Sequence, residues 1–289
     1  MIVKMFSKVG FTFFKRIVVS VSILFLLTFE STNATADHFT SEKYQSHNTN
    51  LLDKMWDEQL TLIDQTQQDD KKRVFYTGFA LWGGEKWALG DAIKLGSAFK
   101  KFYDNRTFFN FIFSNDEVDF LPDKFPTVFE DVVAQHINYL DANSRDDDLI
   151  IFGLYSHGVE EKLIIRLGKE NTRAVTPDEL KLFLDPIRKK NVLLIISACH
   201  AGSFLPHLKS DNIAIAVAAA ADKQSNGCSP LHSQTFYGKN LSEVLSNSSA
   251  FSGDTLSKVM EEAAYQIREK EKWKPKSDPS FFVGDNFSE

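Results

Sequence analysis

Two segments of the chain place residues that can do chemistry directly after an apolar run. The run at 149–155 leads into His157 and Gly158, and the run at 192–197 leads into Cys199. A cysteine attacks carbonyl groups as its thiolate, and a neighbouring imidazole can take the thiol proton and later protonate a leaving amine. If the fold brings the two motifs together, the residue types indicate nucleophilic acyl transfer.

Backbone groups beside these two residues would complete such a site. The amide of Gly158 is unobstructed, and with the amide of Cys199 it would form an oxyanion hole for a tetrahedral intermediate. A helix beginning near Gly202 would further favour the thiolate. Gly158 and Cys199 are therefore the candidate oxyanion donors.

Simpler explanations exist for each residue taken alone. A single cysteine at a strand end is most often a small apolar residue, and a single histidine is more often structural than catalytic. The pairing of the two motifs, each closing a buried strand, favours catalysis. Metal binding calls for spacings such as C-x-x-C; we expect no metal because such spacing is absent from Cys199, His200, His207, Cys228 and His232.

The elements that must position these motifs alternate along the chain. Helical patterns lie at 51–67, 86–103, 127–140, 177–184, 235–246 and 254–271, and strand-like runs lie at 73–79, 107–113, 149–155, 192–197 and 213–219. Continuous apolar strands between helices predict an α/β fold with a mostly parallel sheet covered on both faces. Functional groups gather at the carboxyl ends of such strands, so neighbouring central strands would bring His157 and Cys199 to one rim.

Composition and charge indicate a globular protein and argue against one class of partner. The chain has 289 residues, of which 43% are hydrophobic and 25% charged, with a net charge of −6. This is ordinary globular composition, and an acidic balance argues against nucleic acid as a partner. No linker divides the later part of the chain, so we predict a polar arm and first helix at 37–70 and one catalytic domain at 71–289.

The first 36 residues differ from the rest. Four basic residues precede or flank an apolar run at 17–29, and Ala34-Thr35-Ala36 follows it. A basic region, a short apolar run and an A-x-A site are typical of a secretory signal peptide. The run is short for a membrane span, which needs about 20 residues. We predict export, with an uncleaved membrane anchor or a buried helix as the alternatives.

Cys199 and Cys228 are the two cysteines of the chain. A chain of this size can fold without disulfides, and two cysteines make no framework. A bridge between them stays open at this point, and it would inactivate whichever thiol is reactive.

Several segments resemble the legumain-like cysteine peptidases of family C13, the bacterial branch above all, which share the caspase–haemoglobinase fold. They read SHG at 156–158, SACHAGS at 197–203, VFYTGFALWGGEKWALGDA at 74–92 and IAIAVAAAADKQSNGCSPLHSQTFYGKNL at 213–241. The resemblance spans about 72–285. It implies a caspase-like three-layer α/β/α fold, with His157 as general base and acid, Cys199 as nucleophile, and Gly158 with Cys199 as oxyanion donors. It also implies a polypeptide substrate and no metal or organic cofactor.

The chain departs from that family where asparagine-specific members build their P1 pocket. Ser197 stands two positions before the nucleophile where they have one acid, and Lys239 stands where they have the other. Glu85 lies in the loop where they have an arginine that we cannot match. Ser225 and Gly227 are further pocket candidates, with Cys228 as a pocket-wall residue. We expect an acidic or small P1 residue, and a cleavage screen showing strict Asn or Arg would refute this.

Three functions follow from these residues. The first is a secreted cysteine endopeptidase that forms a thioacyl intermediate. The second is a transamidase or peptide ligase using the same dyad, in which an amine takes the acyl group. The third is a non-catalytic binding domain of the same fold. Products formed with an added amine would separate the first two, and labelling of Cys199 with a thiol probe would test the third.

Overall fold

The computed structural model describes residues 42–115, 125–128, 130–167, 171–272 and 274–289. Residues Lys43–Glu289 form one compact unit. The predicted signal peptide lies outside the described residues. In the part of the chain that is described, no helix combines the length and the apolar character that crossing a membrane requires.

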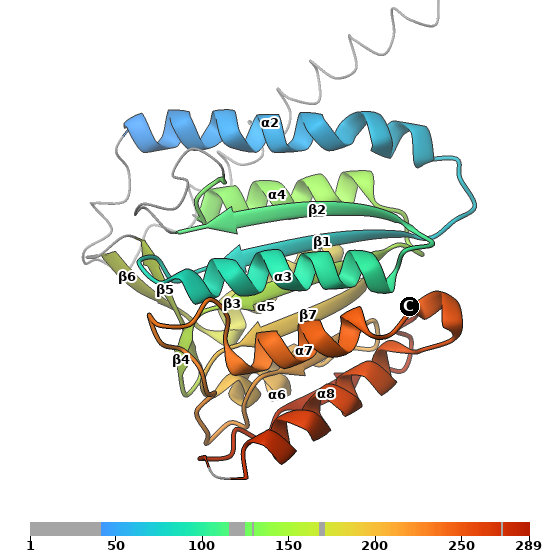
Figure 1. Cartoon of the computed structure of the whole chain (residues 1–289). Helices are drawn as coiled ribbons and strands as arrows, with labels where there is room; N and C mark the ends of the chain where they lie inside the picture. The colour runs from blue at the N-terminus through green and yellow to red at the C-terminus, as the bar shows by residue number, and fades with distance from the viewer. Residues whose placement is uncertain (1–41, 116–124, 129, 168–170, 273) are drawn as a thin grey trace, which may run out of the picture. The chain divides into compact units, whose positions relative to one another are not determined.

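A six-stranded sheet forms the centre of this unit (Figure 1). Its strands run in the order β2 (Thr107–Ser114), β1 (Arg73–Ala80), β3 (Leu149–Tyr155), β7 (Asn191–Ser197), β8 (Ile213–Val217) and β9 (Ser280–Val283). The first five are parallel, and β9 is antiparallel to β8. Every residue of β1, β3, β7 and β8 is buried, which explains why their apolar runs are continuous and confirms the predicted parallel sheet.

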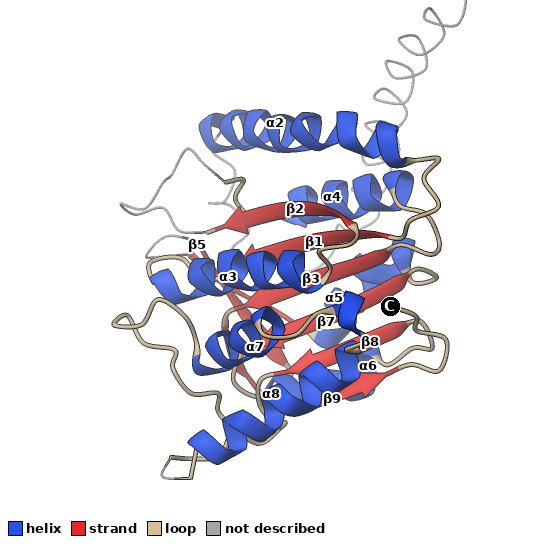
Figure 2. Cartoon of the chain, turned by 45° about the vertical axis from the view of Figure 1, so that its right-hand side comes forward, coloured by secondary structure: helices blue, strands red, loops and turns tan. Residues whose placement is uncertain are grey.

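Helices cover both faces of the sheet, so the fold has the three layers expected (Figure 2). One face packs against α3 (Lys86–Phe102), α7 (Phe236–Ser246) and α8 (Leu256–Lys270). The other packs against α2 (Glu42–Thr66), α4 (Glu130–Asn143), α5 (Pro177–Leu184) and α6 (Leu205–Leu208). Two apolar cores result, one on each side of the sheet.

The sequence predicts the start of α5 correctly but not the start of α2. α5 begins as predicted, because Thr176 caps it, Pro177 occupies its first turn and Glu179 completes a capping box. α2 begins already at Glu42 rather than at Leu51. The polar residues before Leu51 include no Pro or Gly to stop a helix, and Leu52 anchors the helix in the core.

A second, antiparallel sheet was not predicted. It consists of β4 (His157–Val159), β5 (Lys162–Leu167) and β6 (Asn171–Val175), and it follows β3 directly. The amide of Arg166 on β5 donates to the carbonyl of Leu81 at 2.8 Å, and the amide of Gly83 donates to the carbonyl of Arg166 at 2.8 Å. These bonds fix the loop after β1 against β5, at the carboxyl end of the main sheet.

Candidate active site

The two motifs singled out in the sequence lie at one rim of the sheet. β3 and β7 are adjacent and parallel, with Tyr155 opposite Ser197, so the residues two positions further along each chain emerge side by side. His157 and Cys199 both line one cavity of about 530 Å³. A base and a nucleophile that share a cavity are the first requirement for acyl transfer.

Gly158 lets the two motifs approach closely. A Cβ atom at this position would lie 2.3 Å from the carbonyl oxygen of Cys199 and 3.1 Å from the Cβ of Ala198. The first distance is shorter than such contacts allow and the second is tight, so the backbone after β3 touches the backbone after β7 only because residue 158 has no side chain. The Gly158 amide therefore lies beside the turn that carries the thiol.

Cys199 stands at the start of a tight turn. His200 has a left-handed backbone, with φ 57°. Its amide donates to the carbonyl of Lys223 at 2.8 Å, and its Nδ1 lies 2.9 Å from the carbonyl oxygen of Ala221. These two contacts hold a backbone conformation that non-glycine residues adopt uncommonly.

The chain after this turn differs from the expected helix start near Gly202. A 3₁₀ helix, η2 (Ala201–Phe204), comes first, and the four-residue α6 follows it. A helix this short supplies little dipole to a thiolate. The sequence favours a place on or near a helix surface for His200 and His207. His200 is the N-cap of η2 and also lines the cavity. His207 lies on α6, where it contacts Glu161 and Asp178 at 3.6 Å.

The thiolate of Cys199 is stabilised by the neighbouring loop instead. The amide of Ser225 donates to Sγ at 3.3 Å. The thiol of Cys228 also donates to Sγ, and this bond, against the opposing effect of burial, lowers the pKa of Cys199 to about 6. The same contact and burial raise the pKa of Cys228, so the proton that the two groups share stays on Cys228. Both cysteines are free thiols.

His157 is held between aromatic rings. Trp82 and Trp87 lie perpendicular to the imidazole, with centroids 4.4 and 5.1 Å away. Burial lowers the pKa of His157, the carboxylate of Glu85 raises it, and the guanidinium of Arg166 adds to the lowering. Nε2 lies 3.9 Å from Oε2 of Glu85.

The remaining sequence candidates divide into two groups. Ser225 and Gly227 line the cavity. Ser197 is 1% exposed and is not among the lining residues, and its hydroxyl lies 3.2 Å from that of Thr235. Lys239 is exposed on α7 and is not among the lining residues. The acidic P1 preference was expected because of the positive charge of Lys239, and the fold does not bring that charge into the cavity.

The lining residues that were missed in the sequence include Trp82, Gln224 and Asn226. Trp82 follows the first strand at its carboxyl end, where functional groups gather, and this signal could have found it. The loop carrying the other two is shaped by tertiary contacts. Asn226 donates to Glu271 at 2.6 Å and to the carbonyl of Pro275 at 2.9 Å, and no local pattern predicts such partners.

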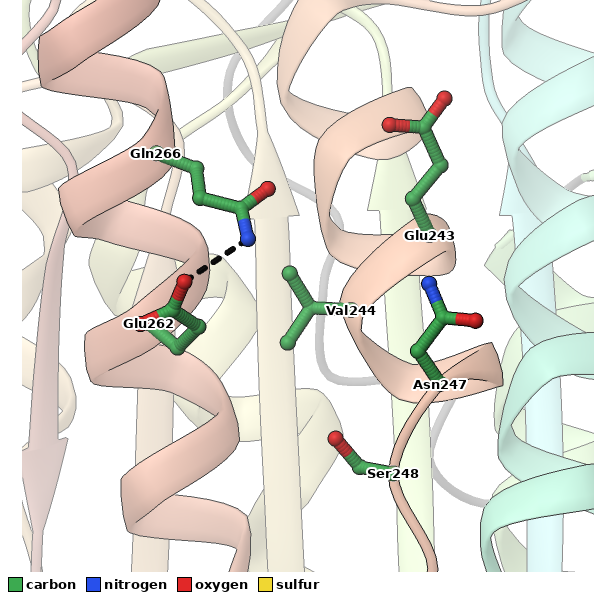
Figure 3. A pocket seen from close by; sticks show the side chains of 6 residues that line it. All are labelled: Glu243, Val244, Asn247, Ser248, Glu262 and Gln266. Atoms are coloured by element: carbon green, nitrogen blue, oxygen red, sulfur yellow. Dashed lines mark hydrogen bonds between the residues drawn. The ribbon is translucent and has the colours of Figure 1, made fainter.

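A second hollow, of about 250 Å³, lies between α7 and α8 (Figure 3). It is polar, and the amide of Gln266 donates to Glu262 across one turn of α8 at 2.8 Å. Its lining has no cysteine and no histidine: Glu243, Val244, Asn247, Ser248, Glu262 and Gln266. Within the described parts of the chain, no three His, Cys, Asp or Glu side chains converge to hold a metal ion.

Comparisons with known proteins agree with this geometry. The model of a family described as the peptidase C13 family matches residues 122–281, more than half of the chain. No curated protein matches. Among solved structures, the crystal structure of caspase-1 from Spodoptera frugiperda matches with a TM-score of 0.50 and 12% identity, over 74% of this chain and 86% of that one. At this identity the likeness shows the fold alone, which is caspase-like.

Proposed function

Because the chain belongs to the legumain-like peptidase C13 family, we propose that it is a cysteine endopeptidase with Cys199 as nucleophile and His157 as general base and acid. The family and the caspase-like fold support a cysteine peptidase in general. One observation supports the specific proposal: the imidazole and the low-pKa thiol line the same cavity, at the carboxyl ends of adjacent strands.

The first half-reaction forms a thioacyl enzyme. His157 takes the proton of the Cys199 thiol, and the thiolate attacks the carbonyl carbon of the scissile peptide bond, so that the carbonyl oxygen takes up the negative charge. The amides of Gly158 and Cys199 donate to that oxyanion. When the tetrahedral intermediate collapses, the C–N bond breaks and protonated His157 gives its proton to the leaving amine.

The second half-reaction releases the acid. A water molecule enters the place of the departed amine, and neutral His157 takes one of its protons as the oxygen attacks the thioester carbon. The C–S bond then breaks, so that the sulfur leaves as a thiolate and a carboxylic acid is released. An amine in place of water would give a new amide, which is the transamidase alternative.

We also propose that the protein is exported. The basic residues, the apolar run at 17–29 and the Ala34-Thr35-Ala36 site support this. N-terminal sequencing of protein recovered outside the cytoplasm should find a new terminus shortly after Ala36. Recovery of the intact terminus in a membrane fraction would instead indicate an anchor.

A peptide-library cleavage assay tests the peptidase proposal. The reduced protein should cut peptides internally, and Cys199→Ala and His157→Ala should each abolish cutting. His207→Ala is the matched control, because His207 lies on α6 outside the cavity, and it should cut normally. Iodoacetamide should label Cys199 much faster than Cys228. Fast labelling without any cleavage would favour a non-catalytic domain, and amide products with an added amine would favour a transamidase.

A further inference from the structure

Glu85 occupies the N-cap position of α3 without capping it. The backbone there is extended, with φ −139° and ψ 130°, as at ordinary N-caps, yet its side chain accepts no bond from the helix amides. Glutamate is not among the residues preferred at this position, which have shorter side chains that reach back to the helix. The Glu85 carboxylate is therefore directed to other partners.

Those partners are an indole and the imidazole of His157. Nε1 of Trp87 donates to Oε2 of Glu85 at 2.5 Å, and the same oxygen lies 3.9 Å from Nε2 of His157. The Glu85 side chain is only 17% exposed. Trp87 is fully buried, so its indole fixes the carboxylate from the protein interior.

The two tryptophans that contact His157 are anchored by different elements. Trp87 lies in the first turn of α3. Trp82 belongs to the loop after β1, which is bonded to Arg166 of β5 through its neighbours, and the Arg166 guanidinium lies 4.9 Å from the Trp82 ring centre. Both indoles are perpendicular to the imidazole, so rotation of the imidazole would bring it against Trp82 or Trp87.

We propose that Glu85 is a positioning residue for His157: anchored by Trp87, its carboxylate fixes the orientation of the imidazole and stabilises the imidazolium that must form during acyl transfer. This rests on the proposed function. It gives Glu85 a different role from the substrate contact expected from the sequence, and it assigns Trp82 and Trp87 to the support of the base.

The charges that act on His157 come from two elements: Glu85 in the loop after β1 and Arg166 on β5. Burial and the Arg166 guanidinium lower the pKa of His157, and the Glu85 carboxylate opposes them. Without that carboxylate, the ring would protonate less readily, and the leaving amine would lack its proton donor.

The titration of His157 tests this without any substrate. Histidine labelled with ¹³C at Cε1 gives one resonance per ring, and His157→Asn assigns the relevant one. Glu85→Gln keeps an acceptor for Trp87 but removes the charge, so the pKa of His157 should fall. Glu85→Asp keeps the charge and should retain a higher pKa than Glu85→Gln. Glu262→Gln on α8, which removes an equal charge far from the cavity, should leave the titration unchanged.

An identical His157 titration in wild type and Glu85→Gln would overturn the proposal, whether or not the protein proves to be a peptidase. With a cleavable peptide, Glu85→Gln should lower kcat by about tenfold or more and leave KM within about twofold, as expected when a group acts on the transition state alone. A raised KM with unchanged kcat would indicate that Glu85 contacts the substrate, as expected from the sequence, and would equally overturn the positioning role.

Discussion

At the scale of single residues, the reactivity of Cys199 depends on its neighbours more than on a helix. The sulfur accepts the Ser225 amide at 3.3 Å and the thiol of Cys228, and these donors outweigh the burial that would otherwise raise its pKa. Cys228 retains its proton because that proton forms the hydrogen bond to Cys199, and because burial and the neighbouring thiolate both oppose a second negative charge. Cys228 is thus a hydrogen-bond donor to the nucleophile rather than a second nucleophile.

Replacing Cys228 by alanine should therefore slow the alkylation of Cys199. With the thiol donor removed, the pKa of Cys199 rises, so less thiolate is present at any pH below it. If the pKa of Cys199 returns to that of an ordinary thiol, near 8.5, the alkylation rate at pH 7 should fall by about thirtyfold. Mass spectrometry of iodoacetamide labelling between pH 5 and 9 measures this.

Cys228→Ser is the matched control, since its hydroxyl can still donate to the sulfur. In Cys228→Ser, iodoacetamide should label Cys199 at lower pH than in Cys228→Ala. If both variants follow the wild-type pH curve, the shared proton has no part in activating Cys199.

At the scale of elements, the site depends on the contact between β4 and the turn after β7. Gly158→Ala would place a Cβ atom 2.3 Å from the Cys199 carbonyl oxygen, and since that neighbour is backbone, one segment must move. A displacement of about 1 Å between a base and a nucleophile can cost 10²-fold in rate. We expect Gly158→Ala to lose about that much kcat/KM while the protein still folds.

Gly253→Ala is the control for this loss. Gly253 lies in open space between α7 and α8, with φ 86°, so alanine there costs about 1–2 kcal/mol of backbone strain without touching the cavity. Circular dichroism and thermal melting show whether the two variants are destabilised alike. If Gly158→Ala then keeps wild-type kcat/KM, the close approach is not needed for activity.

The elements also show where sequence reasoning succeeded. β1, β3 and β7 were predictable because burial on both faces demands continuous apolar runs, and this sufficed to bring His157 and Cys199 to one rim. β4 was not predictable, because three residues carry no periodicity and pair only through β5. The position of Glu85 against His157 depends on bonds between the loop after β1 and Arg166, and the outward direction of Lys239 depends on how α7 packs. Neither has a local signal.

At the scale of the whole molecule, each of the two cores contains a buried titratable group. On the α3 side, Asp91 accepts the amide and hydroxyl of Thr235 at 3.0 and 2.6 Å, and burial raises its pKa to about 7. On the α4 side, His136 accepts from Nε1 of Trp56 at 3.2 Å and lies 2.9 Å from the Thr77 hydroxyl. Burial lowers the pKa of His136 to about 3.

These two groups should make opposite contributions to the pH dependence of stability. Folded Asp91 holds its proton up to a higher pH than in the unfolded chain, so its contribution to the free energy of unfolding is full below about pH 4 and is lost as pH rises toward 7. Folded His136 stays neutral where the unfolded residue is protonated, so its contribution is full above about pH 6.5 and is lost as pH falls toward 3. Between about pH 4 and 6.5 the two slopes offset each other.

When either group is removed, the pH dependence of the free energy of unfolding should show the effect of the other group alone. For one proton this slope is about 1.4 kcal/mol per pH unit. In Asp91→Asn, the free energy of unfolding should rise more steeply from pH 5 to pH 6.5 than in wild type; in His136→Gln it should fall relative to wild type over the same interval. Urea unfolding at the two pH values measures both slopes, and comparing slopes removes the constant cost of each substitution. Asp91 lies on α3 and His136 lies on α4, so the two variants report on opposite faces of the sheet. If both variants had the wild-type slope, neither buried group would have a shifted pKa, and water would reach both cores.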